Sequence, residues 1–281
     1  MGIFSDVLLT VDYDRTLTAP DSTIPERNIE AIRFFMKNGG AFTVNTGRSI
    51  PMAKAFMDKV PVNAPLLLYN GSAAYDTQKQ ELCFMHEIQL DLWKTVREVM
   101  DLFPDLTVEV QALDKHYDFA YNPAWDAFSD NNCAYATAQP DQDLGPFLKF
   151  SLYGELRENT VDHLFRGSPE EIRRMDDAQA LIEQIYGDQV VAFRAGHRII
   201  DVHAKGVSKA RSARELQQKL GRKILVCVGD GENDVSMLRE ADFAFSPADR
   251  DPGLRGDFFR EAVPCNEGAI AYAISQLETL L

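Results

Sequence analysis

Two short apolar runs, far apart in the sequence, each lead into a cluster of aspartates. Residues 7–11 are followed by Asp12 and Asp14, and residues 224–228 are followed by Asp230 and Asp234. A short apolar run with polar residues at its carboxyl end is typical of a buried strand. In open α/β sheets, ligands bind at the carboxyl ends of the strands. The pattern therefore predicts two strands of one sheet whose ends carry a set of carboxylates.

The segments around these runs have the alternation expected of a parallel sheet. Residues 29–36 carry apolar side chains at helical spacing and are followed by Gly39 and Gly40, which is a helix with its stop signal. Apolar runs at 41–44 and 65–69 predict two further strands, and alternating strands and helices indicate an α/β fold. The pattern resumes later, with helices expected over 206–220, 233–240 and 269–281 and strands over 224–228 and 243–245.

The middle of the chain has a different character. Strands are expected over 107–111 and 149–153, and helices over 90–102 and 169–186, which is the content of a separate α+β unit. With 281 residues, the chain is long enough for a core and a sizeable insertion. We therefore predict an α/β fold: a Rossmann-like parallel-sheet core with helices on both faces, formed by residues 1–83 and 197–281 and interrupted by an inserted α+β cap domain, residues 84–196.

The charge of the chain restricts its partners. The formal net charge of −14 argues against nucleic-acid binding, because that role needs a basic surface to replace the counterions of the phosphates. An acidic surface also repels phosphorylated substrates, so phosphate chemistry would need a cation and a few basic side chains. No stretch has the length of a membrane span and the first residues lack a basic leader, so we expect neither a membrane nor a secretory protein.

The cysteines indicate a reducing compartment. They form no C-x-x-C pair, so neither a zinc site nor a disulfide framework is expected, and the cytoplasm is the predicted location. Cys227 lies in an apolar run and is expected to be a buried core thiol. The four cysteines are Cys83, Cys133, Cys227 and Cys265.

The first acidic cluster suggests covalent catalysis. Asp12 has the position of a carboxylate that attacks phosphorus once a divalent cation neutralises the phosphate, and Asp14 that of a general acid and base. Aspartates at a strand end are also common turn formers and helix caps, so the pair alone is a weak signal. In the second cluster, Asp230 and Asp234 lie around a glycine turn at a spacing that suits magnesium. The alternative there is a solvated turn with Asn233 as a helix N-cap.

Two further positions suit phosphate binding. Thr46 ends an expected strand and, with the backbone N–H groups beside Gly47, offers a cradle for a phosphate oxygen, although an ordinary N-cap would have the same sequence. Lys209 lies near the start of an expected helix and would neutralise Asp12 and the phosphoryl group. Lys205 is four residues away, and spacing does not choose between the two lysines.

In this order, the segments 12–18, 46–48, 206–209 and 229–234 resemble the four motifs of the haloacid dehalogenase-like hydrolases. More narrowly, the chain resembles the Cof-like subfamily with a type IIB cap, because Asn70-Gly71 and the position of the insertion also match. The resemblance covers nearly the whole chain, and the motifs are specific as a set. One residue departs from the pattern: Arg15 stands where the family usually has glycine, which leaves the local backbone geometry open.

The resemblance implies a role for each matching residue. Asp12 would be the nucleophile and a magnesium ligand, and Asp14 the general acid/base and a metal ligand through its backbone carbonyl. Asp230 and Asp234 would be the metal anchors, Thr46 a phosphate ligand and Lys209 the motif lysine. Phosphate or substrate contacts would come from Gly47, Arg48, Asn70, Lys209 and Asn233. Candidates in the inserted segment are left unassigned: His116, His163, Arg166, Arg173, Arg174, Arg194 and His197. Trp125 is expected to fill the core of the cap.

The prediction is a magnesium-dependent phosphatase that hydrolyses a small phosphorylated metabolite, a sugar phosphate, through an aspartyl phosphate. Mg²⁺ is the expected cofactor, and neither nucleic acid nor a membrane is an expected partner. Two alternatives use the same scaffold. A sugar phosphomutase would return the phosphoryl group to a sugar, and a non-catalytic regulator would only bind sugar phosphates, although the presence of all four aspartates counts against it.

Overall fold

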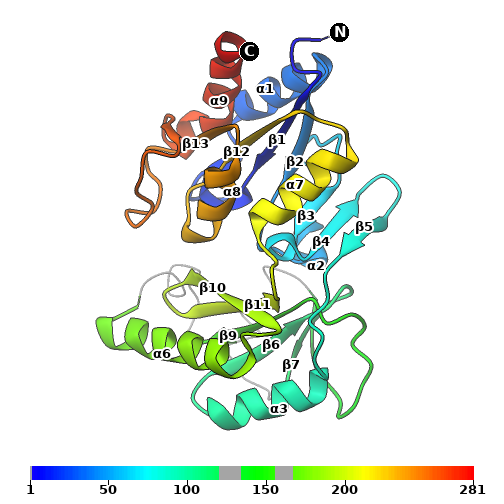
Figure 1. Cartoon of the computed structure of the whole chain (residues 1–281), viewed down its shortest axis with the longest axis vertical. Helices are drawn as coiled ribbons and strands as arrows, with labels where there is room; N and C mark the ends of the chain where they lie inside the picture. The colour runs from blue at the N-terminus through cyan, green and yellow to red at the C-terminus, as the bar shows by residue number, and fades with distance from the viewer. Residues whose placement is uncertain (1, 120–133, 156–166) are drawn as a thin grey trace. The chain divides into compact units, whose positions relative to one another are not determined.

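The computed structural model describes residues 2–119, 134–155 and 167–281. It consists of two compact units, which are described separately (Figure 1). The first contains Met1–Gly47, Phe56–Phe84 and Ser208–Leu281, and the second contains Arg48–Ala55 and Met85–Val207. Trp125, Cys133, His163 and Arg166 lie outside the described residues.

The first unit is built on a parallel sheet with the strand order β14-β13-β12-β1-β2. In this order β1 lies between β12 and β2, and Val11 is the register partner of both Val228 and Val44. The residues that follow these three strands therefore leave the sheet at the same level. The strand bounds are β1 Val7–Val11, β2 Ala41–Val44, β12 Ile224–Val228, β13 Phe243–Ser246 and β14 Arg260–Glu261.

Helices pack against this sheet and bury it. All five residues of β1 are buried, as expected for a strand of a parallel sheet covered on both faces. One helix pair is α1 with α9, and another is α7 with α8. The predicted α/β fold is confirmed. The bounds are α1 Glu26–Lys37, α7 Lys209–Lys219, α8 Val235–Glu240 and α9 Ala269–Leu280, whereas the short helix α2, Ile50–Ala53, belongs to the second unit.

The run at 65–69 differs from its prediction as a further strand of the parallel sheet. Strand β3 (Leu66–Leu68) meets the end of β2 through a single parallel bridge, Asn45 to Leu67, and pairs antiparallel with β4 (Ala73–Asp76). The reason is the turn Tyr69–Gly71, whose residues all have positive φ and reverse the chain at once. A small sheet results, in the order β3-β4-β5, with β5 at Glu81–Met85.

In its described residues, the second unit contains a six-stranded sheet in the order β10-β11-β9-β6-β7-β8 together with the helices α3 and α6. Helix α6 starts at a capping box, in which Ser168 and Glu171 satisfy each other's backbone N–H groups. Apolar side chains from both helices and the sheet form one core that includes Val99, Ile182 and Phe150. The bounds are α3 Leu92–Leu102, β6 Thr107–Gln111, β7 His116–Asp118, β8 Tyr135–Thr137, β9 Lys149–Tyr153, α6 Pro169–Tyr186, β10 Val190–Gly196 and β11 Ile199–Ala204.

The point at which the chain re-enters the first unit differs from the expected boundary at 196/197. Strand β11 follows β10 through a tight turn and pairs antiparallel with both β10 and β9, so it completes the sheet of the second unit. The chain returns to the first unit at Ser208. None of the described helices is both long and apolar enough to cross a membrane.

Thr10 on β1 and Thr43 on β2 are register partners, and we expect their replacement to change the free energy of unfolding in opposite directions. Both are buried, but Thr43 Oγ1 donates to the Pro65 carbonyl at 2.6 Å, whereas Thr10 Oγ1 has no hydrogen-bond partner within the described structure. We expect Thr10→Val to raise the free energy of unfolding by about 1 kcal/mol, and Thr43→Val to lower it by about 1–2 kcal/mol because it leaves a buried carbonyl unpaired. Urea denaturation of both variants checks this, and shifts of the same sign would contradict it.

Candidate active site

The side chain of Lys209 lies at the centre of the polar groups that gather at the carboxyl edge of the parallel sheet. Lys209 is the first residue of α7, which begins after the N-cap Ser208. Its Nζ lies 2.6 Å from Asp12 Oδ1 and 2.6 Å from Asp234 Oδ1, and the side chain is fully buried. By contrast, Lys205 Nζ donates to the backbone carbonyl of Gly187 in the second unit. The structure therefore brings Lys209, and not Lys205, to the aspartates.

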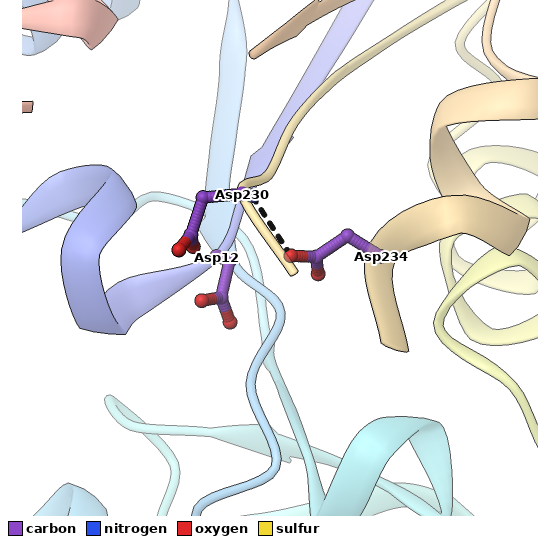
Figure 2. A group of neighbouring side chains, drawn as sticks. All are labelled: Asp12, Asp230 and Asp234. Atoms are coloured by element: carbon purple, nitrogen blue, oxygen red, sulfur yellow. Dashed lines mark hydrogen bonds between the residues drawn. The ribbon is translucent and has the colours of Figure 1, made fainter. Parts of the chain in front are cut away.

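Three of the predicted aspartates converge on this lysine. Asp12 follows β1 directly, Asp230 follows β12 after one glycine, and Asp234 ends the turn Glu232–Asp234. Each offers a carboxylate oxygen, and these oxygens all lie within 4.8 Å of one another. Figure 2 shows that the three side chains come from separate segments and approach one another at the end of β1. Buried carboxylates at this separation are a chemically suitable donor set for a hard divalent cation.

Asp234 shapes the loop that carries Asp230. Its Oδ2 accepts the backbone N–H of Asp230 at 3.0 Å (Figure 2). The same Oδ2 accepts the backbone N–H of Gly231 at 2.9 Å, while Oδ1 accepts a hydrogen bond from Lys209. A Cβ at Gly229 would lie 2.5 Å from Asp234 Cγ, so a glycine is required at that position. Both oxygens of Asp234 are thus engaged within the protein, which leaves Asp12 and Asp230 with more open ligand positions.

Asp230 joins the loop after β12 to the turn after β1. Its Oδ1 accepts a 2.7 Å hydrogen bond from the buried hydroxyl of Thr16, and its Oδ2 lies 4.0 Å from Arg15 Nε. Arg15 itself has φ 58° and ψ 9°, the left-handed conformation that glycine would adopt freely. Arg15 therefore adopts a conformation that costs a non-glycine residue about 1 kcal/mol of local strain.

Burial and mutual repulsion change the proton affinity of the carboxylates. Burial raises the pKa of Asp12 well above its usual range, Lys209 lowers it, and the charges of Asp234 and Asp230 raise it further. For Asp230, burial and then the charge of Asp234 raise the pKa to about 7. Burial alone would lower the pKa of Lys209, but Asp12 and Asp234 raise it above its ordinary value. The lysine is thus a permanent cation beside carboxylates that repel one another.

The predicted phosphate-binding residues form a second group, at the ends of β2 and β3. The Thr46 carbonyl accepts the N–H of Asn70 at 3.0 Å, and Asn70 Oδ1 accepts a 3.2 Å hydrogen bond from Asn233 Nδ2. A Cβ at Gly47 would lie 3.0 Å from Asn70 Oδ1, which explains why the smallest residue stands there. Thr46, Gly47, Asn70 and Asn233 are therefore brought together.

The other two predicted residues have different positions. Asp14 is half-buried in the turn that follows β1, two residues after Asp12. Arg48 is the first residue of a segment that belongs to the second unit.

A polar cluster on the sheet of the second unit was not predicted from the sequence. Lys149 and Asp201 form a 2.8 Å ion pair between β9 and β11, and Glu109 lies 2.9 Å from His116 Nδ1. All four are nearly inaccessible to solvent. Burial also lowers the pKa of the neighbouring His203 to about 3, which keeps it neutral. The available signal was the presence of charged residues within otherwise apolar strands, such as Glu109 in residues 107–111.

Comparison with known proteins agrees with this geometry. A sequence profile of the haloacid dehalogenase-like hydrolases matches residues 9–255. Among curated relatives, the 5-amino-6-(5-phospho-D-ribitylamino)uracil phosphatase YbjI of Escherichia coli is 26% identical over 249 residues, which are 85% of this chain and 84% of the relative. The HMP-PP phosphatase of Serratia proteamaculans is 22% identical over 240 residues, 82% of this chain and 80% of the relative.

Solved structures show the same fold. A haloacid dehalogenase-like hydrolase from Bacteroides thetaiotaomicron superposes with a TM-score of 0.75 at 17% identity, covering 96% of this chain and 98% of that one. The sugar phosphatase BT4131, of subclass IIB, gives a TM-score of 0.76 at 17% identity with the same two coverages. The chain belongs to the haloacid dehalogenase-like hydrolase family, as its motifs predicted.

The raised pKa of Asp230 makes a prediction for the metal-free protein. Because the folded-state pKa of about 7 exceeds the unfolded value, the native state binds the extra proton, and the free energy of unfolding falls as the pH rises from about 4 to 7. Asp230→Asn removes the cost of burying a charged carboxylate and keeps an acceptor for Thr16. At pH 8 it should therefore raise the free energy of unfolding by roughly 2–4 kcal/mol.

The gain should shrink towards zero as the pH approaches 4. Urea denaturation in the presence of EDTA at pH 8 and pH 4.5 measures it. A variant that is less stable than the wild type at pH 8 would show that the charged carboxylate of Asp230 does not destabilise the fold.

Proposed function

We propose that this protein is a magnesium-dependent phosphatase that hydrolyses a small phosphorylated metabolite through an aspartyl phosphate on Asp12. The observation that carries the proposal is the placement of Asp12: a buried carboxylate at the end of β1, with Oδ1 2.6 Å from the ammonium of Lys209 and other carboxylates within 4.8 Å. A carboxylate needs a neutralised phosphate before it can attack phosphorus. The fixed cation of Lys209 and a bound divalent cation together would meet this need.

The donor set suits magnesium. Mg²⁺ binds carboxylate oxygens and retains positions for water and phosphate. Among the described residues, no hydrogen bond engages Asp12 Oδ2 or Asp230 Oδ2. The backbone carbonyl of Asp14 would be a further ligand. We assign Asp234 mainly to holding Lys209 and the loop, since both of its oxygens are already engaged. The bound ion would neutralise the phosphate and polarise its oxygens.

The residues of the first unit divide the reaction into two steps. Asp12 Oδ attacks phosphorus, the bond from phosphorus to the ester oxygen breaks, and Asp14 gives its proton to the leaving alkoxide. Asp14 then takes a proton from a water molecule, the water oxygen attacks phosphorus, and the acyl phosphate returns Asp12 and free phosphate. Lys209 compensates the charge on the phosphoryl oxygens throughout. Thr46, Asn70 and Asn233 would bind those oxygens through hydroxyl and amide groups.

A sugar phosphate is the substrate class we favour. The solved structures of similar fold include a sugar phosphatase, and YbjI acts on a phosphorylated ribityl compound, according to their names. A phosphomutase would use the same first step, and free phosphate release without a bisphosphate activator separates the two.

The described cysteines Cys83, Cys227 and Cys265 are free, which fits the reducing cytoplasm.

The nucleophile assignment predicts that Asp12→Asn lowers magnesium-dependent phosphate release from para-nitrophenyl phosphate by at least about 10³-fold, because an amide does not attack phosphorus. Asp6→Asn is the matched control. Asp6 lies just before the other end of the same strand, where it pairs with Lys223 on the surface, so its variant should retain full activity. Undiminished turnover by Asp12→Asn would remove Asp12 from this role.

The substrate class is tested by a screen of phosphorylated metabolites with magnesium. We expect sugar phosphates to give kcat/KM values well above that of the aryl phosphate. Equal values for sugar phosphates and for the aryl phosphate would contradict the sugar-phosphate assignment while leaving the phosphatase assignment intact.

A further inference from the structure

Asn45, at the end of β2, contacts the backbone of the site lysine. Its side chain is fully buried, and Nδ2 donates a 2.9 Å hydrogen bond to the carbonyl of Lys209. The same Nδ2 lies 3.9 Å from the sulfur of Met237. Within the described structure, Asn45 Oδ1 accepts no hydrogen bond. A buried amide in this strand thus uses its donor on one residue and leaves its acceptor unpaired.

This arrangement is unfavourable for stability alone. A buried polar atom without a partner loses its hydration and gains nothing in return, so an apolar residue of similar shape, such as leucine, would suit the position better. The feature that leucine could not supply is the hydrogen bond to the Lys209 carbonyl. The presence of an amide here therefore indicates a role that depends on that bond.

The bond fixes the start of α7 relative to β1. The backbone N–H of Asn45 donates to the carbonyl of Val11 at 2.8 Å, and Val11 directly precedes Asp12. The side chain of Asn45 then reaches the first residue of α7. Lysine has a long and flexible side chain, so the position of its ammonium depends on where its backbone is held. The Lys209 carbonyl also accepts a 3.1 Å hydrogen bond from Ser212 Oγ, but Ser212 belongs to α7 itself, whereas Asn45 links this backbone to the strand that carries the nucleophile.

We propose that Asn45 is a positioning residue that holds Lys209 so that its Nζ meets Asp12 and Asp234 together. The inference rests on the proposed role of Lys209 in phosphate-ester hydrolysis. It concerns a residue outside the motif positions that suggested the site.

The test compares two asparagines that hold the two ends of β2. Asn45→Leu should lower kcat by about tenfold and change KM by less than about twofold, since it loses one hydrogen bond behind a group that acts mainly in the transition state. Asn63→Leu is the control. It removes a 2.7 Å bond from the Phe42 N–H and a 2.9 Å bond to the Gly40 carbonyl at the other end of the strand, so it should lower Tm and leave kcat unchanged.

A double-mutant cycle separates positioning from loss of stability. In a Lys209→Ala background the side chain that Asn45 positions is gone, so Asn45→Leu should have no further effect on kcat. An equal loss of kcat in both backgrounds would overturn the proposal, as would a loss that Asn63→Leu reproduces.

The structural part has its own measurement. Crystal structures of the wild type and of Asn45→Leu should show Lys209 Nζ moving out of hydrogen-bond distance of Asp12 or Asp234. An unchanged contact in Asn45→Leu would overturn this proposal, whether or not the wild type releases phosphate. A wild type that releases no phosphate would contradict only the proposed function.

Discussion

The contact of the buried Lys209 ammonium with Asp12 and Asp234 is the interaction on which the site depends. It joins the end of β1, the start of α7 and the loop after β12, three segments that are distant in the sequence. Removing any one partner would leave an uncompensated buried charge, which is more costly than the loss of an exposed ion pair. The parallel sheet aligns the segments that make this contact, because Val11 and Val228, the last residues of β1 and β12, are register partners.

Lys209 compensates only part of the charge that surrounds it. With Asp230 included, three carboxylates share one ammonium, and burial together with the repulsion between them raises the pKa of Asp12 and Asp230. The metal-free fold thus stores electrostatic strain at the sheet edge, which a divalent cation would relieve by replacing protons. In a chain with a net charge of −14, the cation that these carboxylates would bind is also what would draw a phosphate ester to an otherwise repulsive protein.

The sequence predicted the parts of the structure that depend on local pattern. The apolar runs before Asp12 and Asp230 became neighbouring strands, and the turns after them delivered the carboxylates. Features that depend on tertiary pairing were not predicted. Strand β11 looks like a return to the core, yet it completes the second sheet. Asn45 reads as an ordinary polar residue before Thr46, because nothing local reveals that its amide reaches a carbonyl 164 positions away.

The strained backbone around the site is also a consequence of tertiary contacts and not of local sequence pattern. Tyr69, Asn70 and Gly71 have φ of 53°, 53° and 99°, a run that two non-glycine residues adopt only when the surroundings impose it. At Gly71 the constraint is packing, since a Cβ would lie 2.5 Å from the Ser208 carbonyl beside the start of α7. The turn that presents Asn70 is therefore wedged against the helix that presents Lys209. This close contact acts together with the hydrogen bond from Asn45 to the Lys209 carbonyl, and both fix where α7 begins.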